Sequence, residues 1–183
     1  MRWIAMTILF FTPTAFGITD GQSGLNISVA GSIEMAGENR PMAFRASPGV
    51  SLPITAWHGN YDSAFALGRY WGGGVSPNVH WHGQNTFVKA PVHVERGMDL
   101  IVLGIRFYGG VGPMWFINET ETKIGATAQL GAAIKYRLNK NIGPTLRLTV
   151  GADYLDGEVN PTGQIQLGFD FSTRIKPPSG IND

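Results

Sequence analysis

The chain contains no cysteine and little charge. Asp, Glu, Lys and Arg make up 15% of its 183 residues, and the formal net charge is +1. Without cysteine there is no disulfide, so an exported form depends on its backbone hydrogen bonds and its packing. The near-neutral balance gives no electrostatic reason to expect a nucleic-acid partner.

Long apolar runs are also missing after the first residues of the chain. A spanning helix needs about 20 consecutive apolar residues, so no transmembrane helix is expected there. Glycine, in contrast, is abundant, with 25 residues. Few charges, much glycine and no long apolar run together favour a β protein and leave a membrane location open.

The first 17 residues have the features of a secretory signal peptide. Arg2 supplies the positive charge, Trp3 to Phe11 form a short apolar stretch, and Ala15 and Gly17 place small residues at a cleavage site. The alternative is an N-terminal membrane anchor, but the apolar stretch has about half the length that an anchor needs. We therefore predict cleavage after Gly17, followed by a short flexible lead over residues 18–24.

Most of the remaining chain alternates between apolar and polar residues. The cleanest example runs from Ile124 to Leu138. Every second residue there is apolar, and Thr127, Gln129 and Lys135 lie at the positions between. A period of two is typical of strands rather than helices. The pattern predicts eight strands, at about 24–36, 41–55, 63–73, 84–95, 98–116, 122–138, 144–155 and 163–174.

Asn, Asp, Gly and Pro cluster at the breaks between these strands, as expected for turns. The predicted turns are Gly37 to Pro41, Glu95 to Met98, Asn139 to Asn141, and Asp156 to Pro161. The longest break is the glycine-rich segment from Gly72 to Gln84.

The apolar faces predict which side of the sheet meets lipid. Several strands offer five to eight apolar positions, and an eight-stranded interior is only just wide enough to be filled by side chains. The polar faces carry Gly, Ser, Thr, Gln and single Arg residues rather than a coat of Lys and Glu. We therefore predict an all-β fold, an eight-stranded antiparallel up-and-down transmembrane β-barrel over residues 25–175. The alternative is a secreted soluble barrel or sandwich with an apolar ligand inside.

Charged residues on the polar faces would then lie in the lumen, where they must be paired. The predicted lumen charge network comprises Glu34, Arg45, Arg69, Lys89, Glu95, Arg106, Lys135, Arg137, Arg147, Asp153, Asp170 and Arg174. Basic groups outnumber acidic groups in this set. Two interpretations follow: a structural plug with some wet positions, or a narrow anion-biased pore.

Aromatic residues gather near the predicted strand ends, as in the interfacial girdles of membrane barrels. The alternative is ordinary strand composition, because aromatic residues favour strands anywhere. The residues concerned are Trp57, Tyr61, Tyr70, Trp71, Trp81, Trp115, Phe116 and Tyr154.

With its signal peptide, its eight alternating strands and a closing strand that ends in Phe169-Asp170-Phe171, the chain resembles the OmpA/OmpX-like class of small outer-membrane barrels. The resemblance covers Leu25 to about Arg174 and implies that both termini face the periplasm, with the loops near 37–41, 72–84, 117–122 and 155–162 facing outward. One departure is that Ser172 to Asp183 follow the last aromatic residue, which often ends the chain in that class. Residues 176–183 would form a periplasmic tail.

His80, His82 and Ser76 are the weak candidates for chemistry. Two histidines spaced by two in one strand point to the same side and could hold a metal with a third ligand, but no acidic residue adjoins them. Lipid A deacylases of the PagL type place a Ser two residues from a His, and neither histidine here has that neighbour. We therefore expect no metal and no cofactor.

The function expected from the sequence is a structural or surface-interaction role in the bacterial outer membrane. The partners would be outer-membrane lipid and lipopolysaccharide, with a host or envelope surface reached through the outward loops. A lipid-modifying enzyme and a narrow anion-biased pore are the alternatives.

Overall fold

The computed structural model describes residues 22–37, 44–62, 67–100, 102–138 and 141–175, and all of its regular elements are strands. Within these residues no helix has the length and apolar character to cross a membrane. The predicted signal peptide and tail lie outside the described residues. The strands are β1 (Gln22–Gly37), β2 (Phe44–Ser51), β3 (Ile54–Asp62), β4 (Leu67–Val75), β5 (Asn78–His82), β6 (Asn85–Lys89), β7 (Val92–Leu100), β8 (Leu103–Ile117), β9 (Thr122–Tyr136), β10 (Ile142–Leu155) and β11 (Glu158–Ile175).

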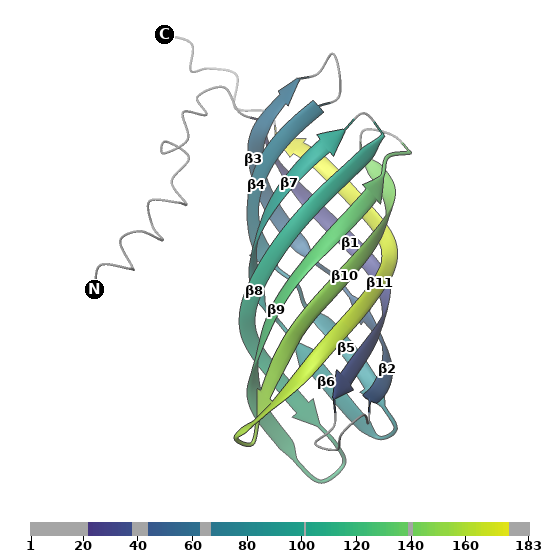
Figure 1. Cartoon of the computed structure of the whole chain (residues 1–183), viewed down its shortest axis with the longest axis vertical. Helices are drawn as coiled ribbons and strands as arrows, with labels where there is room; N and C mark the ends of the chain where they lie inside the picture. Colours follow the sequence, from purple (N-terminus) through teal and green to yellow (C-terminus); the bar gives the residue numbers. More distant parts are fainter. Residues whose placement is uncertain (1–21, 38–43, 63–66, 101, 139–140, 176–183) are drawn as a thin grey trace, which may run out of the picture.

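These elements form a closed ring of 8 antiparallel strands (Figure 1). The pairs β2/β3, β4/β5 and β6/β7 each follow one course around the ring, so they count as single strands with an interruption. The first and last strands close the ring, in a register that runs from Ser23 opposite Ile175 to Ala36 opposite Thr162. The predicted eight-stranded antiparallel barrel is confirmed.

Prolines cause the interruptions, because proline has no N–H to donate to a ladder. Pro53, Pro77 and Pro91 lie at the three gaps, and Pro113 lies on the adjoining strand β8. The carbonyl oxygen of each proline accepts a backbone hydrogen bond from the neighbouring strand, at 2.8, 2.9, 2.9 and 3.1 Å respectively. The prolines therefore form one row across four adjacent strands without opening the sheet.

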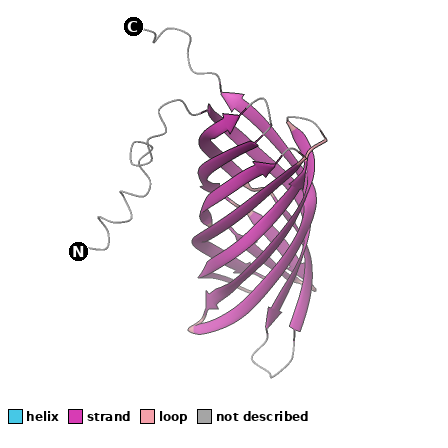
Figure 2. Ribbon diagram, turned by 45° about the horizontal axis from the view of Figure 1, so that its top comes forward, coloured by secondary structure: helices cyan, strands magenta, loops and turns pink. Residues whose placement is uncertain are grey.

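The wall of the barrel is apolar outside and polar inside. Large apolar side chains on the outer face are well exposed, among them Ile124 at 73%, Val150 at 67% and Leu130 at 66%. Most inward residues are small, polar or charged, with several aromatic rings among them, and most are buried. Figure 2 shows the strands wrapped around this single interior. The predicted orientation, with the apolar faces outward, is the one that the structure has.

The turn predicted at Glu95 to Met98 is wrong. These residues belong to β7, which continues to Leu100, and β8 begins at Leu103. The misleading signal was Gly97, which faces the lumen beneath the ring of Tyr70. A Cβ at this position would lie 2.0 Å from the ring, so glycine is required here for packing rather than for a turn.

Two other predicted breaks are shorter than expected. Most of Gly72 to Gln84 forms the end of β4 and all of β5, and Asp156-Gly157 alone joins β10 to β11. Both residues of this second turn have positive φ, 55° and 85°, as in a type I′ hairpin. At the N-terminal limit of the predicted barrel, β1 begins at Gln22 rather than at Leu25.

The two ends of the barrel are unlike. The turns at 83–84, 118–121 and 156–157, and the ends of β1 and β2 that adjoin residues 38–43, lie at one end, which we call the loop end. The start of β1 and the end of β11 lie at the opposite end, which we call the terminal end (Figure 1). Of the four loops predicted to share one face, the described turns at 118–121 and 156–157 lie at this loop end; of the predicted loop 72–84 only the turn at 83–84 does, and residues 38–41 lie outside the described residues.

Replacing Gly157 with alanine is expected to destabilise the barrel by about 1–2 kcal/mol, because a side chain with a Cβ is strained at positive φ. Urea unfolding of the protein in detergent micelles measures this. Gly163→Ala is the matched control, since its Cβ would meet only the Thr149 carbonyl oxygen at 4.0 Å. Equal midpoints for the two variants would contradict the assignment of the turn.

Candidate functional site in the barrel lumen

Charged and polar side chains from nearly every strand fill the lumen. Because each strand contributes every second residue, groups distant in sequence meet across the interior. Most of the residues predicted for the lumen charge network do point inward, namely Glu34, Arg45, Lys89, Glu95, Arg106, Lys135, Arg137, Arg147, Asp153 and Asp170.

Asp170 is the centre of the cluster nearer the terminal end. Its side chain is fully buried (0% exposed) and is ion-paired with Arg106. Arg147 lies 3.6 Å from its other carboxylate oxygen, and the Ser28 hydroxyl donates a hydrogen bond to the same oxygen. One carboxylate thus serves two guanidinium groups and a hydroxyl.

Lys89 is the centre of a second cluster, nearer the loop end. Its Nζ lies 2.5 Å from Glu34 Oε2 and 2.6 Å from Asp153 Oδ2. All three side chains are 5% exposed or less. The charge ratio is the reverse of that in the first cluster, with one cation between two carboxylates, so the two clusters together are balanced.

Sequence reasoning missed one lumen acid, Asp99, which is ion-paired with Arg137 at the terminal end. The misplaced turn at 95–98 hid it. With β7 extended to Leu100, the inward series His93, Glu95, Gly97 and Asp99 is unbroken. This addition brings the acidic and basic side chains of the lumen close to equal number.

Two histidines lie between the charged clusters, each held by hydroxyl groups. His93 is bonded to Thr55 Oγ1 and to Ser76 Oγ, both at 2.9 Å. His80 Nε2 lies 3.0 Å from Ser32 Oγ and 2.8 Å from the side-chain nitrogen of Gln164. Neither set of partners was predicted, because the contacts depend on the register between strands.

The contacts of His80 resemble a catalytic triad only in their order. Glu34 Oε2 lies 3.7 Å from His80 Nδ1, so a hydroxyl, an imidazole and a carboxylate follow one another. However, Gln164 shares the nitrogen that a nucleophilic Ser32 would need, and Lys89 is ion-paired with Glu34. Ser32 is also buried, at 7% exposed, so its hydroxyl is largely shielded from the surface.

The three weak candidates for chemistry are not brought together. Ser76 is bonded to His93 rather than to His80, and His82 is exposed at the loop end. Among the described residues, no group of three or more His, Asp or Glu side chains is placed to hold a metal ion.

Two residues of the predicted network need separate mention. Arg69 is exposed on the outer wall, because the inward residues of β4 are its neighbours Gly68 and Tyr70. The prediction that it lies in the lumen is therefore wrong. The side chain of Arg174 lies outside the described residues. Of the others, Lys135 Nζ donates to Ser172 Oγ at 2.9 Å, and the guanidinium of Arg45 lies 3.9 Å from the centre of the Phe87 ring.

Aromatic rings narrow the lumen toward both ends. Trp57 and Tyr70, with ring centres 5.9 Å apart, are buried inside the terminal end. Phe87 and Phe116, 5.3 Å apart, lie near the loop end. Trp57, Tyr70 and Phe116 were expected in an interfacial girdle, and for these three the prediction is wrong. Trp57 and Tyr70 lie inside because Gly24 and Gly97, which face them, leave room for their rings.

The structure is similar to known small outer-membrane β-barrels. Neisserial surface protein A (NspA) superposes with a TM-score of 0.59 at 8% sequence identity, covering 80% of this chain and 96% of that one. The outer membrane enzyme PagL gives 0.48 at 11% identity, covering 80% and 98%. Ail of Yersinia pestis, in complex with the heparin analogue sucrose octasulfate, gives 0.47 at 13% identity, covering 85% and 100%.

No family model matches the chain, and no curated protein is similar to it in sequence. Its fold is that of the OmpA/OmpX-like class of small outer-membrane barrels. Together with the apolar outer wall, this similarity points to the bacterial outer membrane.

Replacing Asp170 with asparagine is expected to lower the free energy of unfolding by about 3–5 kcal/mol, since it leaves buried guanidinium groups without their counter-charge. Urea unfolding in micelles measures this as well. Glu119→Gln, at an exposed turn position, is the control and is expected to change stability by less than about 0.5 kcal/mol. A D170N barrel as stable as the wild type would show that the lumen pairs are hydrated and separable.

Proposed function

We propose that this chain is an outer-membrane barrel with a closed lumen, which acts at the cell surface through its loop end. In this proposal residues 1–17 are removed as a signal peptide on export, the terminal end faces the periplasm and residues 176–183 form a periplasmic tail. The observation that carries the proposal is the combination of an apolar outer wall with a lumen crossed by paired charges.

The pairing favours a plug over an anion-biased pore. Conduction needs charges that can bind an ion and release it. Here Asp170 holds two guanidinium groups and Lys89 holds two carboxylates, so the cations most suited to attract an anion are already engaged. The aromatic pairs on either side narrow the route further.

The described part of the loop end supports a contact role. Asn118 Oδ1 accepts hydrogen bonds from the backbone N–H groups of Thr120 and Glu121, which fixes the turn. Lys123 Nζ lies 2.7 Å from Asp156 and 3.1 Å from Glu121, which ties this turn to the next one. A rigid, exposed surface of this kind is suited to recognition, whether of lipopolysaccharide or of a host or envelope surface.

The orientation can be tested with single cysteines, because the wild-type chain has none. Glu119→Cys at the loop end is expected to react in intact cells with a maleimide that cannot cross membranes. Val102→Cys, which is 49% exposed at the terminal end, is the matched control. It is expected to react only after the outer membrane has been permeabilised. The reverse pattern would invert the proposed orientation.

Closure of the lumen can be tested in planar bilayers. The folded protein, identified by a band that shifts on boiling, is expected to show no ion conductance steps. Steady anion-selective steps would instead establish the pore. A protein that is soluble without detergent and shows no heat-shifted band would refute the membrane location itself.

A further inference from the structure

The outer wall carries two cations among its described side chains, Arg69 and Arg96. Both are exposed, and both lie toward the terminal end, on the paired strands β4 and β7. The rest of the described outer wall is dominated by large apolar residues. Two arginines on a surface that faces lipid are costly unless an anionic group meets them.

Trp71 joins the two arginines into one patch. It stands directly opposite Arg96, whose guanidinium lies 5.1 Å from the centre of the indole ring. Arg69 precedes Trp71 by two residues on the same face, which makes it the diagonal neighbour of Arg96, at a Cα separation of roughly 7–8 Å. Both guanidinium groups can therefore reach one phosphate.

The patch lies near the level of a membrane interface. Arg69 is close to the start of β4 at Leu67, and Arg96 is close to the end of β7 at Leu100. Tryptophan and arginine are the residues that anchor barrels and helices at the headgroup level, where long cationic side chains extend toward the polar layer.

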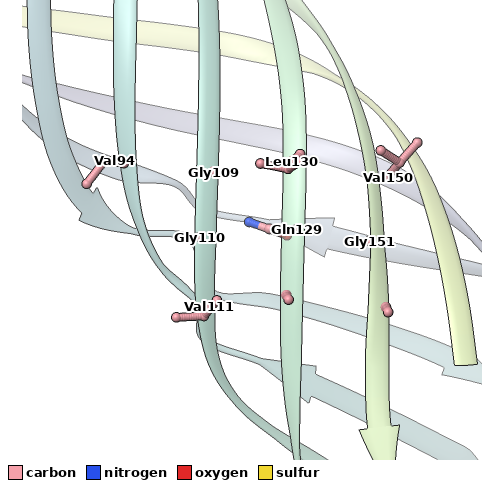
Figure 3. Close-up of a pocket in the computed structure, with 10 residues that line it drawn as sticks. Val94, Gly109, Gly110, Val111, Gln129, Leu130, Val150 and Gly151 are labelled. Atoms are coloured by element: carbon pink, nitrogen blue, oxygen red, sulfur yellow. The ribbon is translucent and has the colours of Figure 1, made fainter. Parts of the chain in front are cut away.

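An apolar groove of about 650 Å³ lies on the outer wall across β7, β8, β9 and β10 (Figure 3). Val94, two residues before Arg96 on the same face of β7, forms one wall, and Leu130 and Val150 rise on the other side. Between them Gly109 and Ala128 leave the floor low. Val94 is thus the lining residue through which the groove adjoins the cationic patch.

We propose that Arg69, Trp71, Arg96 and this groove form a binding site for an anionic glycerophospholipid of the leaflet at the terminal end. The phosphate lies between the two guanidinium groups, and one acyl chain occupies the groove. The inference rests on the membrane location proposed above. An anionic headgroup is favoured because the ammonium group of a zwitterionic lipid would be repelled by the second arginine.

The test is native mass spectrometry of the folded, heat-shifted protein in detergent, titrated with phosphatidylglycerol or phosphatidylethanolamine. The wild type is expected to retain phosphatidylglycerol preferentially. The double variant Arg69→Gln/Arg96→Gln is expected to bind it about thirtyfold more weakly, since each arginine near an anionic lipid surface contributes about 1 kcal/mol. Thr173→Gln, which places the same side chain at an exposed position of the terminal end on β11, away from both arginines, is the control and is expected to leave binding unchanged.

A second variant separates the headgroup from the acyl chain. Ala128→Leu fills the groove without touching the arginines, and is expected to weaken retention of long-chain phosphatidylglycerol while the preference over phosphatidylethanolamine remains. Competition by free glycerol phosphate as strong as that of the lipid would show that the groove plays no part. Equal retention of both lipids by a folded wild-type barrel would overturn the inference and leave the proposed function intact. A protein that needs no detergent would overturn both.

Discussion

The closing ladder between β1 and β11 is the constraint on which the rest of this structure depends. A sheet edge exposed to lipid would leave its N–H and C=O groups without partners, so a membrane sheet has to close on itself. Here the closure extends from Ser23 to Ala36 along the first strand. Once the ring is fixed at eight strands, the interior has room for side chains and little else. Every inward residue must then find its partners among the other inward residues.

That requirement explains the composition of the lumen. Charges enter it in groups that neutralise one another, around Asp170 in one half and around Lys89 in the other, and hydroxyl groups hold the histidines between them. Glycines opposite large rings are part of the same arrangement. Gly97 leaves the space that the Tyr70 ring occupies, and Gly24 leaves the space for the Trp57 ring. The interior is therefore specified by complementarity between strands, whereas most of the outer wall needs only apolar character.

This difference decides how much of the molecule could be predicted from its sequence. Alternation along one strand identifies strands and faces, and it correctly placed most of the lumen charges. It failed where a glycine inside β7 resembled a turn, which hid Asp99, and where the phase of β4 was unclear, which put Arg69 on the wrong side. The hydroxyl partners of His80 and His93 could not be predicted from the sequence, for another reason. They depend on which residues stand opposite one another in different strands, and a single sequence does not contain that information.

The row of prolines also restricts how neighbouring strands can slide. Sheets can usually shift their pairing by two residues and keep both faces in place. In this barrel the positions that lack an N–H are aligned across adjacent strands, and each proline carbonyl already accepts a bond from the next strand. A shift of two residues would bring a position without a donor opposite a carbonyl that needs one, inside lipid, where water cannot replace the lost bond. The prolines that interrupt the strands therefore also select the register: in this half of the barrel they favour the observed pairing over pairings shifted by two residues.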